Sequence, residues 1–285
     1  MDYRDFACPN CKHHPLENEG SRLHCHSCGA LYPIQQSVPL LFPREAPSVL
    51  VNRRKITLSE VMEVYDRAYN HAGLMGTELD EGYDRHTKKV LLDFAQPLDG
   101  KRVLDLGAGV GRLWEYVTGE VKGYAIEPSI VGATKVVERK KGLTVSASVG
   151  EAIPFMEDFF DAVIAADTVE HTFSPQQTIG EIWRVLKPKG ILAASFPVPN
   201  SLSRWGRNQL VLRNYSPLFM VRLLWILVKR VLIFRKAAFQ PIDRDMEAQE
   251  WVSLLERSGF AVRRLVEWPD APQLPIVYLV HAEKS

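Results

Sequence analysis

Hydrophobic positions in the middle and C-terminal parts of the chain fall into short runs separated by longer amphipathic stretches. Seven runs suit buried strands, at 103–106, 122–127, 144–148, 159–167, 191–197, 261–268 and 276–282. Apolar side chains at helical spacing predict helices at 58–70, 83–94 and 245–258. Strands that alternate with helices indicate an α/β fold, so we expect a doubly wound sheet of seven strands.

An insertion at 199–242 separates the fifth and sixth predicted strands and has a different pattern. It is strongly apolar and contains no acidic residue. Ser216 and Pro217 are typical of an N-cap and a first helical position, and they predict a helix over Leu218–Phe234. The basic residues of the insertion are Arg204, Arg207, Arg213, Arg222, Lys229, Arg230, Arg235 and Lys236.

A helix that is apolar around most of its circumference lies either in a protein interior or in lipid. Several interpretations of 218–234 therefore stay open. It is a substrate lid, a homodimer face, or an interfacial membrane helix with Arg222, Lys229 and Arg230 as anchors. An RNA-binding groove is less favoured, because aliphatic side chains outnumber the aromatic and basic ones.

Composition narrows the class of protein. With 285 residues, 46% hydrophobic and 24% charged, the chain has room for one large and one small domain. A net charge of +1 gives no overall attraction to nucleic acid. The N-terminus lacks the basic and then apolar pattern of a signal peptide, and no apolar run is long enough to span a bilayer. We expect a cytoplasmic protein, and the membrane hypothesis for 218–234 adds peripheral contact at the inner membrane face.

All four cysteines lie near the N-terminus, in two C-x2-C pairs. This arrangement is typical of a tetrahedral zinc site, whose ligands here are Cys8, Cys11, Cys25 and Cys28. Disulfides are less favoured because nothing else indicates an oxidising compartment, and a thioredoxin-like role because neither pair opens a βαβ unit. The neighbouring histidines, His13, His14, His24 and His26, are expected to be solvated. About forty residues bury little core, so we expect zinc to fold this segment independently of the rest.

A glycine-rich turn follows the first predicted strand of the sheet, and Glu127 ends the second. Glycine lets the backbone pass close to a ligand, and a carboxylate at this position can accept hydrogen bonds from two ribose hydroxyls. A dinucleotide-binding fingerprint would place its third glycine at position 112, where the chain has Arg112. The spacing therefore does not favour NAD. The candidate cofactor-binding residues are Asp105, Gly107, Ala108, Gly109, Gly111 and Glu127.

The stretch D-x-G-x-G-x-G from Asp105 to Gly111 resembles motif I of the class I S-adenosylmethionine (SAM) methyltransferases. SAM is cationic at its sulfonium and ammonium groups, so an acidic residue beside the glycines is favourable. G-E-A-I-P-F at Gly150–Phe155 and W-R-V-L-K-P-K-G at Trp183–Gly190 are similar to further stretches of the family. The resemblance covers about 101–284 outside the insertion. It implies SAM as cofactor, with adenine near the backbone of Gly150 and Glu151.

The fourth predicted strand ends in A-D-T-V-E-H-T, which resembles the L-E-H-V stretch of the same family. Ligands of open α/β sheets bind at the carboxyl ends of strands, so Asp167 and His171 are candidate catalytic residues, and Asp167 is also a candidate cofactor contact. Three roles stay open for His171. It is expected to be a general base, a divalent-metal ligand together with Asp167 or Glu170, or a structural residue that forms a hydrogen bond in the loop. Tyr65 and Asp66 resemble a pair that covers the cofactor, although the same helix also suits simple packing on the sheet.

The first 43 residues resemble the zinc-ribbon domains of methyltransferase activators. We therefore predict a zinc ribbon at 1–43, a linker at 44–57 and a SAM-dependent methyltransferase domain at 58–285. The resemblance to the O-methyltransferases of ubiquinone biosynthesis implies transfer of a methyl group to a small, lipophilic molecule. Two alternatives stay open: an rRNA or tRNA base methyltransferase with an RNA-binding zinc ribbon, and a non-catalytic SAM-binding adaptor.

Overall fold

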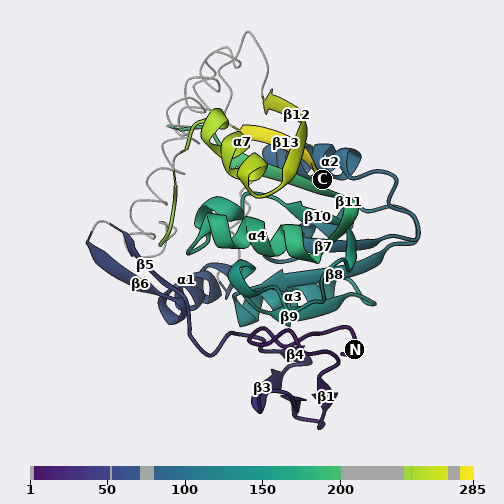
Figure 1. The fold of residues 1–285 in the computed structure, drawn as a ribbon, viewed down its shortest axis with the longest axis vertical. Coiled ribbons are helices and arrows are strands. Elements are labelled where there is room, and N and C mark those ends of the chain that lie inside the picture. The colour runs from purple at the N-terminus through teal and green to yellow at the C-terminus, as the bar shows by residue number, and fades with distance from the viewer. Residues whose placement is uncertain (1–2, 52, 71–79, 200–240, 245, 269–276) are drawn as a thin grey trace, which may run out of the picture.

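The computed structural model describes residues 3–51, 53–70, 80–199, 241–244, 246–268 and 277–285. Its centre is a seven-stranded sheet in the order β12-β13-β11-β10-β7-β8-β9 (Figure 1). The strands are β7 (Arg102–Leu106), β8 (Lys122–Glu127), β9 (Thr144–Ala147), β10 (Phe160–Ala165), β11 (Leu186–Pro197), β12 (Phe260–Trp268) and β13 (Val277–Lys284). All neighbours are parallel except β13, which is antiparallel to β11 and β12. The predicted fold class is confirmed.

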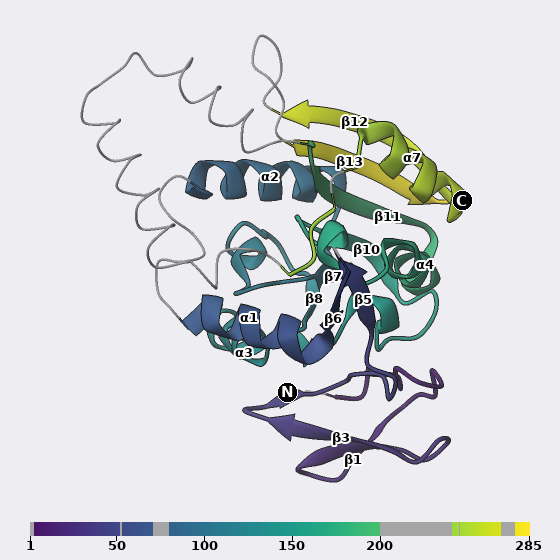
Figure 2. The same ribbon diagram turned by 90° about the vertical axis from the view of Figure 1, so that its left-hand side faces the viewer.

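Helices cover both faces of this sheet because side chains alternate along each strand. Val103 of β7 lies in one buried cluster, together with side chains of two helices, α2 (Asp80–Phe94) and α3 (Ile130–Arg139). Leu104 and Leu106 point to the other face and lie in a second cluster with α4 (Pro175–Val185) and α7 (Ala248–Arg257). The remaining described helix, α1 (Leu58–Asn70), packs against α3 (Figure 2).

Several boundaries differ from those expected from the sequence. The five-residue turn Gly107–Gly111 after β7 leads into a short 3-10 helix, Arg112–Glu115. Strand β11 begins at Leu186, earlier than the expected start at residue 191, because Leu186 pairs with Phe160 before the register shifts. The predicted linker 44–57 contains a two-stranded antiparallel sheet, β5 (Ser48–Val51) and β6 (Arg54–Thr57). The predicted helix 218–234 lies outside the described residues.

The N-terminal residues form a small sheet in the order β1-β2-β3-β4 that packs on the edge of the large one at β9. Its strands are β1 (Glu17–Asn18), β2 (Arg22–Cys25), β3 (Ala30–Gln35) and β4 (Val38–Pro39). Just after β4, the Leu41 amide donates to the Ala147 carbonyl of β9 at 2.8 Å. Figure 1 shows this small domain beside β9.

Aromatic side chains join the small domain to the sheet. Phe6 is fully buried, with its ring 5.2 Å from that of Phe155. Tyr124 of β8 contacts Phe155 edge-on and donates its hydroxyl to Asp5 at 2.7 Å. Lys12 forms a 2.7 Å ion pair with Glu181 of α4. Because the two parts share one hydrophobic core, this packing argues against independent folding of the N-terminal segment.

Within the part of the chain that the structure describes, no helix combines the length and the apolar character needed to cross a bilayer.

Candidate functional site

A cavity of about 410 Å³ opens at the carboxyl ends of β7, β8, β9 and β10. This volume is in the range of small-molecule sites. Predicted site residues that line it are Asp105, Gly107, Ala108, Gly109, Glu127, Gly150, Glu151, Asp167 and His171. Gly111 is not among the lining residues. A Cβ at Gly111 would lie 3.3 Å from the Val136 Cα atom, so this glycine allows close packing on α3.

The glycine turn, at Gly107, packs closely against Thr168, which follows β10. Gly107 has φ +71°, and a Cβ there would lie 2.4 Å from the Thr168 Cγ2 atom. Thr168 is fixed, because its hydroxyl donates to the Leu106 carbonyl at 2.9 Å. Any side chain at Gly107 would therefore meet both an unfavourable backbone conformation and a fixed neighbour.

Glu127 is a buried acidic group of the cavity wall, 3% exposed. Its two carboxylate oxygens accept backbone N–H groups, one from Gly109 at 2.9 Å and one from Ser129 at 3.0 Å. Burial raises the pKa of Glu127 to about 8, against the lowering effect of these two hydrogen bonds. Each oxygen retains a lone pair for a further donor, so the group fits the two hydroxyls of a ribose. The residues present thus fit the cofactor that the motif implies.

Helix α1 both covers the cavity and packs on α3. Tyr65 and Tyr69 line the cavity, with their rings stacked 6.1 Å apart. Asp66 faces away from it and accepts hydrogen bonds from the Ser129 hydroxyl and the Val131 amide at the start of α3. Gly132 allows the close approach, since a Cβ there would lie within 3 Å of Tyr69 and Glu127 side-chain atoms. Helix α1 therefore lines the cavity and at the same time packs on α3.

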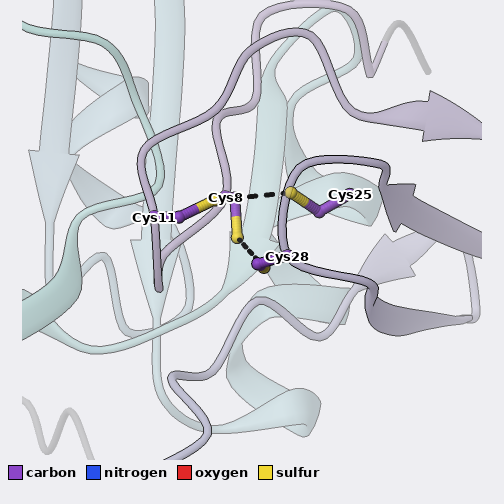
Figure 3. Close-up of side chains that lie close together, drawn as sticks. All are labelled: Cys8, Cys11, Cys25 and Cys28. Carbon is purple, nitrogen blue, oxygen red and sulfur yellow. Dashed lines mark hydrogen bonds between the residues drawn. The ribbon is translucent and has the colours of Figure 1, made fainter.

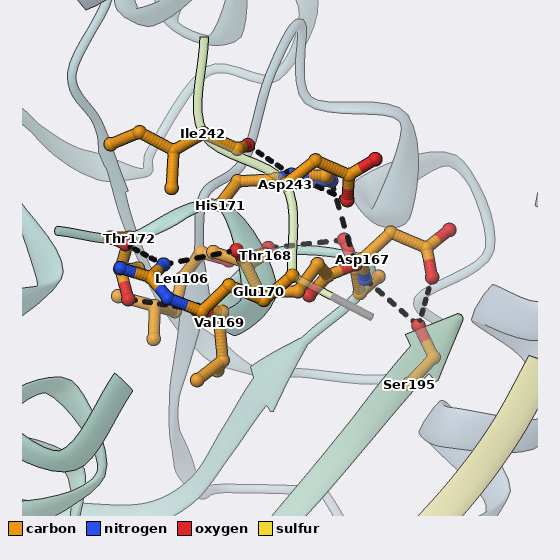
Figure 4. A network of polar contacts seen from close by, with 12 residues as sticks. Leu106, Asp167, Thr168, Val169, Glu170, His171, Thr172, Ser195, Ile242 and Asp243 are labelled. Carbon is orange, nitrogen blue, oxygen red and sulfur yellow. Dashed lines mark hydrogen bonds and ion pairs between the residues drawn. The ribbon is translucent and has the colours of Figure 1, made fainter. Parts of the chain in front are cut away.

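Asp167 is held in an unusual backbone conformation at the mouth of the cavity. Its φ is +49°, which is uncommon for a residue with a side chain. Ser195 of β11 donates its hydroxyl to the Asp167 carboxylate at 2.7 Å and accepts the Asp167 amide at 2.8 Å (Figure 4). This pair of bonds fixes the carboxylate that a strained loop residue presents to the cavity.

His171 lies in a short 3-10 helix, Val169–His171, that follows β10. Its Nδ1 is 2.9 Å from the Ile242 carbonyl, so Nδ1 carries the proton and Nε2 is the basic atom (Figure 4). Burial lowers the pKa of His171, which leaves the ring neutral at pH 7. Nε2 lies 3.5 Å from a carboxyl oxygen of Glu170, which is long for a hydrogen bond.

Glu170 is buried in the loop that carries His171, and Arg244 holds this loop in place. Glu170 is 1% exposed, and its Oε2 atom has no hydrogen-bond partner among the described residues. Burial and the nearby Asp167 carboxylate raise the pKa of Glu170 well above its ordinary value. The Arg244 guanidinium donates to three backbone carbonyls of the loop, those of Glu170, Thr172 and Phe173.

The residues of this site that were not predicted from the sequence include Gly132, Tyr69, Ser195 and Arg244. Gly132 and Tyr69 have local signals, a glycine between the second and third predicted strands and an aromatic residue four positions after Tyr65. Ser195 lies within a predicted strand and Arg244 just beyond the insertion, and nothing in either local pattern distinguishes them. Their contacts join segments that lie 28 and 71 or more residues apart.

The four cysteines converge as predicted (Figure 3). Their sulfur atoms all lie within 4.8 Å of one another, with Cys8 and Cys28 3.6 Å apart and Cys11 and Cys25 3.5 Å apart. Tetrahedral zinc with Zn–S bonds of about 2.3 Å places its sulfurs about 3.8 Å apart. Each C-x2-C turn is closed by a backbone hydrogen bond to its first cysteine, from Lys12 at 2.9 Å and from Gly29 at 2.8 Å. The donor set therefore fits a structural zinc ion.

Comparison with known sequences identifies two families in the chain. Residues 104–194 match the methyltransferase domain family, and residues 6–37 match the Trm112p-like protein family. One similar curated protein is the ubiquinone/menaquinone biosynthesis C-methyltransferase UbiE of Vibrio vulnificus, 30% identical over 162 residues, which are 52% of this chain and 62% of that protein. Another is the demethylmenaquinone methyltransferase of Renibacterium salmoninarum, 29% identical over 143 residues, 49% of this chain and 60% of that protein. The matched region thus spans about three-fifths of these relatives.

Solved structures agree on the fold. One is the complex between the Haloferax volcanii Trm112 methyltransferase activator and a protein assigned as a methyltransferase. The match has a TM-score of 0.56 and 15% identity, and it covers 79% of this chain and 97% of that chain. Another is the N-methyltransferase NodS of Bradyrhizobium japonicum with S-adenosyl-L-homocysteine (SAH), with a TM-score of 0.55, 13% identity, and 79% and 98% covered. The chain therefore contains a match to the methyltransferase domain family at 104–194 and a match to the Trm112p-like protein family at 6–37, and its fold is that of these solved structures.

Proposed function

We propose that this protein transfers a methyl group from SAM to a small, lipophilic molecule. The observation that carries the proposal is the buried Glu127 carboxylate, which is fixed by the Gly109 and Ser129 amides at the wall of the cavity. Two further findings support it. The glycine turn leaves room for a ligand beside this carboxylate, and the curated relatives include C-methyltransferases of ubiquinone and menaquinone biosynthesis.

When bound, SAM would supply an electrophilic methyl group on a sulfonium. The residues of this chain then act mainly by positioning. Glu127 orients the ribose, and the Asp167 carboxylate, fixed by Ser195, provides negative charge beside the cationic groups. Nε2 of the neutral His171 accepts a proton where the acceptor must lose one on methylation.

Calorimetry with SAM and SAH on the purified full chain tests cofactor binding. We expect both to bind, and binding of neither would rule out the enzyme and the adaptor alike. Incubation with SAM carrying a labelled methyl group and a panel of quinols and phenols then tests the acceptor class. Label in a bulk RNA fraction and in none of the lipophilic compounds would favour the nucleic-acid alternative over our proposal. Cofactor binding without transfer to any of these acceptors would favour the adaptor.

We further propose that the Trm112p-like domain supports the methyltransferase domain within one chain. A solved relative pairs a methyltransferase activator with a separate protein, whereas here β4 and the residues after it lie along β9 of the same chain. Phe6 is the anchor of this contact, so Phe6→Ala should destabilise the whole protein by about 3–5 kcal/mol. Leu31→Ala is the matched control, because Leu31 lies in the same domain but is 48% exposed.

Thermal unfolding followed by the aromatic signal of the large domain measures this effect. A single transition that moves down together with SAH affinity supports the proposal. Two separate transitions, with SAH affinity unchanged in Phe6→Ala, would show that the domain is an independent module.

Peripheral membrane contact and a homodimer remain predictions that rest on 218–234. A cytoplasmic location likewise remains a prediction.

A further inference from the structure

The small N-terminal domain has a second cluster of metal-ligating side chains outside its four cysteines. Glu17, His24 and His26 offer ligand atoms that all lie within 4.8 Å of one another. Of the eight histidines of the chain, four are in this domain. None of the three cluster residues takes part in the cysteine site, and none lines the cavity of the large domain.

The hairpin fixes the relative positions of these three side chains. Glu17 of β1 and His24 of β2 are directly paired across the antiparallel ladder. Leu23 and Cys25 are fully buried, so His24 between them points to the outer face of the hairpin. His26 follows on the same side, with its ring 4.3 Å from that of His24. Two imidazoles and a carboxylate therefore face solvent from one side of the sheet.

Glu19 orients the first imidazole. Its carboxylate accepts the Nδ1–H of His24 at 2.9 Å and is itself held by Arg22 at 2.6 Å. This arrangement leaves Nε2 of His24 as the atom with a free lone pair. A carboxylate that holds the far nitrogen of a histidine is the usual outer partner of a metal-bound imidazole, where it fixes the tautomer and raises the basicity of the ligand.

We propose that Glu17, His24 and His26 form a second metal site, which takes a borderline divalent transition metal such as zinc. Two nitrogen ligands and one carboxylate oxygen suit this class of ion, whereas magnesium and calcium prefer oxygen ligands throughout. In the structure His26 Nε2 already contacts the Glu17 carboxylate, and the ion takes the place of the proton that they share. Three protein ligands leave at least one coordination position for water, so this site is open where the cysteine site is closed.

Equilibrium dialysis of the full-length zinc-bound protein against Zn²⁺, read by elemental analysis, tests the proposal. We expect the wild type to bind a second zinc ion more weakly than the first. The double variant His24→Gln with His26→Gln should lose only this second ion. His13→Gln is the matched control, because His13 is an exposed histidine of the same domain outside the cluster. Glu19→Gln removes no ligand and should weaken the second ion about 10–100-fold.

Cobalt substitution shows whether the variants retain the cysteine site. Thiolate-to-cobalt charge-transfer absorption comes only from that site, so it should be unchanged in the double variant and in Glu19→Gln. The proposal is overturned if the wild type saturates with one zinc ion per chain, or if the double variant still binds the second ion. Loss of the charge-transfer band in the double variant would mean that this variant has lost the cysteine site as well. Glu19→Gln is then the deciding variant, and an unchanged affinity of Glu19→Gln for the second zinc ion would count against the proposed site.

Discussion

The cavity has two walls that are built in different ways. The glycine wall, Gly107–Gly109 with Glu127, is held by a hydrogen bond between residues 18 positions apart, within one βαβ unit. The histidine wall, Asp167–Phe173, is held by Ser195, 28 residues from Asp167, and by Ile242 and Arg244, 71 or more residues from their partners. The glycine wall is therefore held by contacts between residues close in sequence, and the histidine wall by contacts between distant segments. We expect substitutions in the glycine wall to change cofactor affinity and substitutions in the histidine wall to change the stability of that wall.

The largest effect on ligand affinity is expected at the glycine wall. Glu127→Ala removes both acceptors for the ribose hydroxyls and should weaken SAH binding by about 1.5–3 kcal/mol, roughly 10-fold to 150-fold, the usual range for a charged hydrogen-bonding group. Calorimetry measures the dissociation constant. Glu138→Ala, at an exposed acidic residue of α3, is the control and should bind as the wild type does. An unchanged dissociation constant in Glu127→Ala would remove the cofactor assignment.

At the histidine wall we expect a loss of order with little loss of cofactor affinity. Arg244→Ala leaves the Glu170, Thr172 and Phe173 carbonyls without their charged donor and should destabilise the protein by about 1.5–3 kcal/mol. Hydrogen exchange of amides 167–173 should become faster, while SAH affinity stays within about twofold. Arg257→Ala, at an exposed arginine of α7, is the control. A loss of SAH affinity as large as that of Glu127→Ala would show that the two walls form one unit.

This difference also explains which parts of the structure could be predicted from the sequence. Strand positions and the glycine turn follow from hydrophobic runs and from backbone requirements that act over a few residues, as at Gly107. The convergence of the four cysteines follows from the spacing of two short pairs. Ser195 and Arg244 could not be identified, because a serine in a strand and an arginine after an insertion have no function until the fold brings Asp167 and the Glu170 carbonyl to them.

The pH dependence of cofactor binding should also reflect the glycine wall. The pKa of Glu127 is raised to about 8 by burial, so at pH 6–7 most of the free protein has this carboxyl protonated. Ribose hydroxyls donate best to the ionised form, and binding below the pKa must release a proton. SAH affinity should therefore rise with pH by at most about tenfold per unit and level off above about pH 8.

Glu127→Gln is the control for this titration. Either orientation of its amide points an NH₂ group at a backbone donor, Gly109 or Ser129, so the variant should bind weakly. It should also lose the pH dependence between pH 6 and 8. A slope that persists in Glu127→Gln would assign the titration to another group, and the raised pKa of Glu127 would no longer explain the binding.

The last effect is expected at Glu170, on the histidine wall, whose carboxyl we expect to be uncharged in the folded protein. Its pKa is raised well above the ordinary value because it is buried beside Asp167. In the window between the ordinary pKa of about 4.3 and the raised value, the folded protein binds a proton that the unfolded chain releases. This group therefore makes the free energy of unfolding fall as pH rises.

The variant Glu170→Gln keeps the shape of the side chain and a hydrogen-bond donor, but it does not titrate. Its free energy of unfolding should equal that of the wild type near pH 4.5 and exceed it by a margin that grows, at most about 1.4 kcal/mol per pH unit, until the pH reaches the raised pKa. Denaturant unfolding at several pH values measures the margin, and Glu170→Ala, which opens a void, should be destabilised at every pH. If the stability of Glu170→Gln relative to the wild type instead falls as pH rises, Glu170 is ionised in the folded protein and its pKa is not raised.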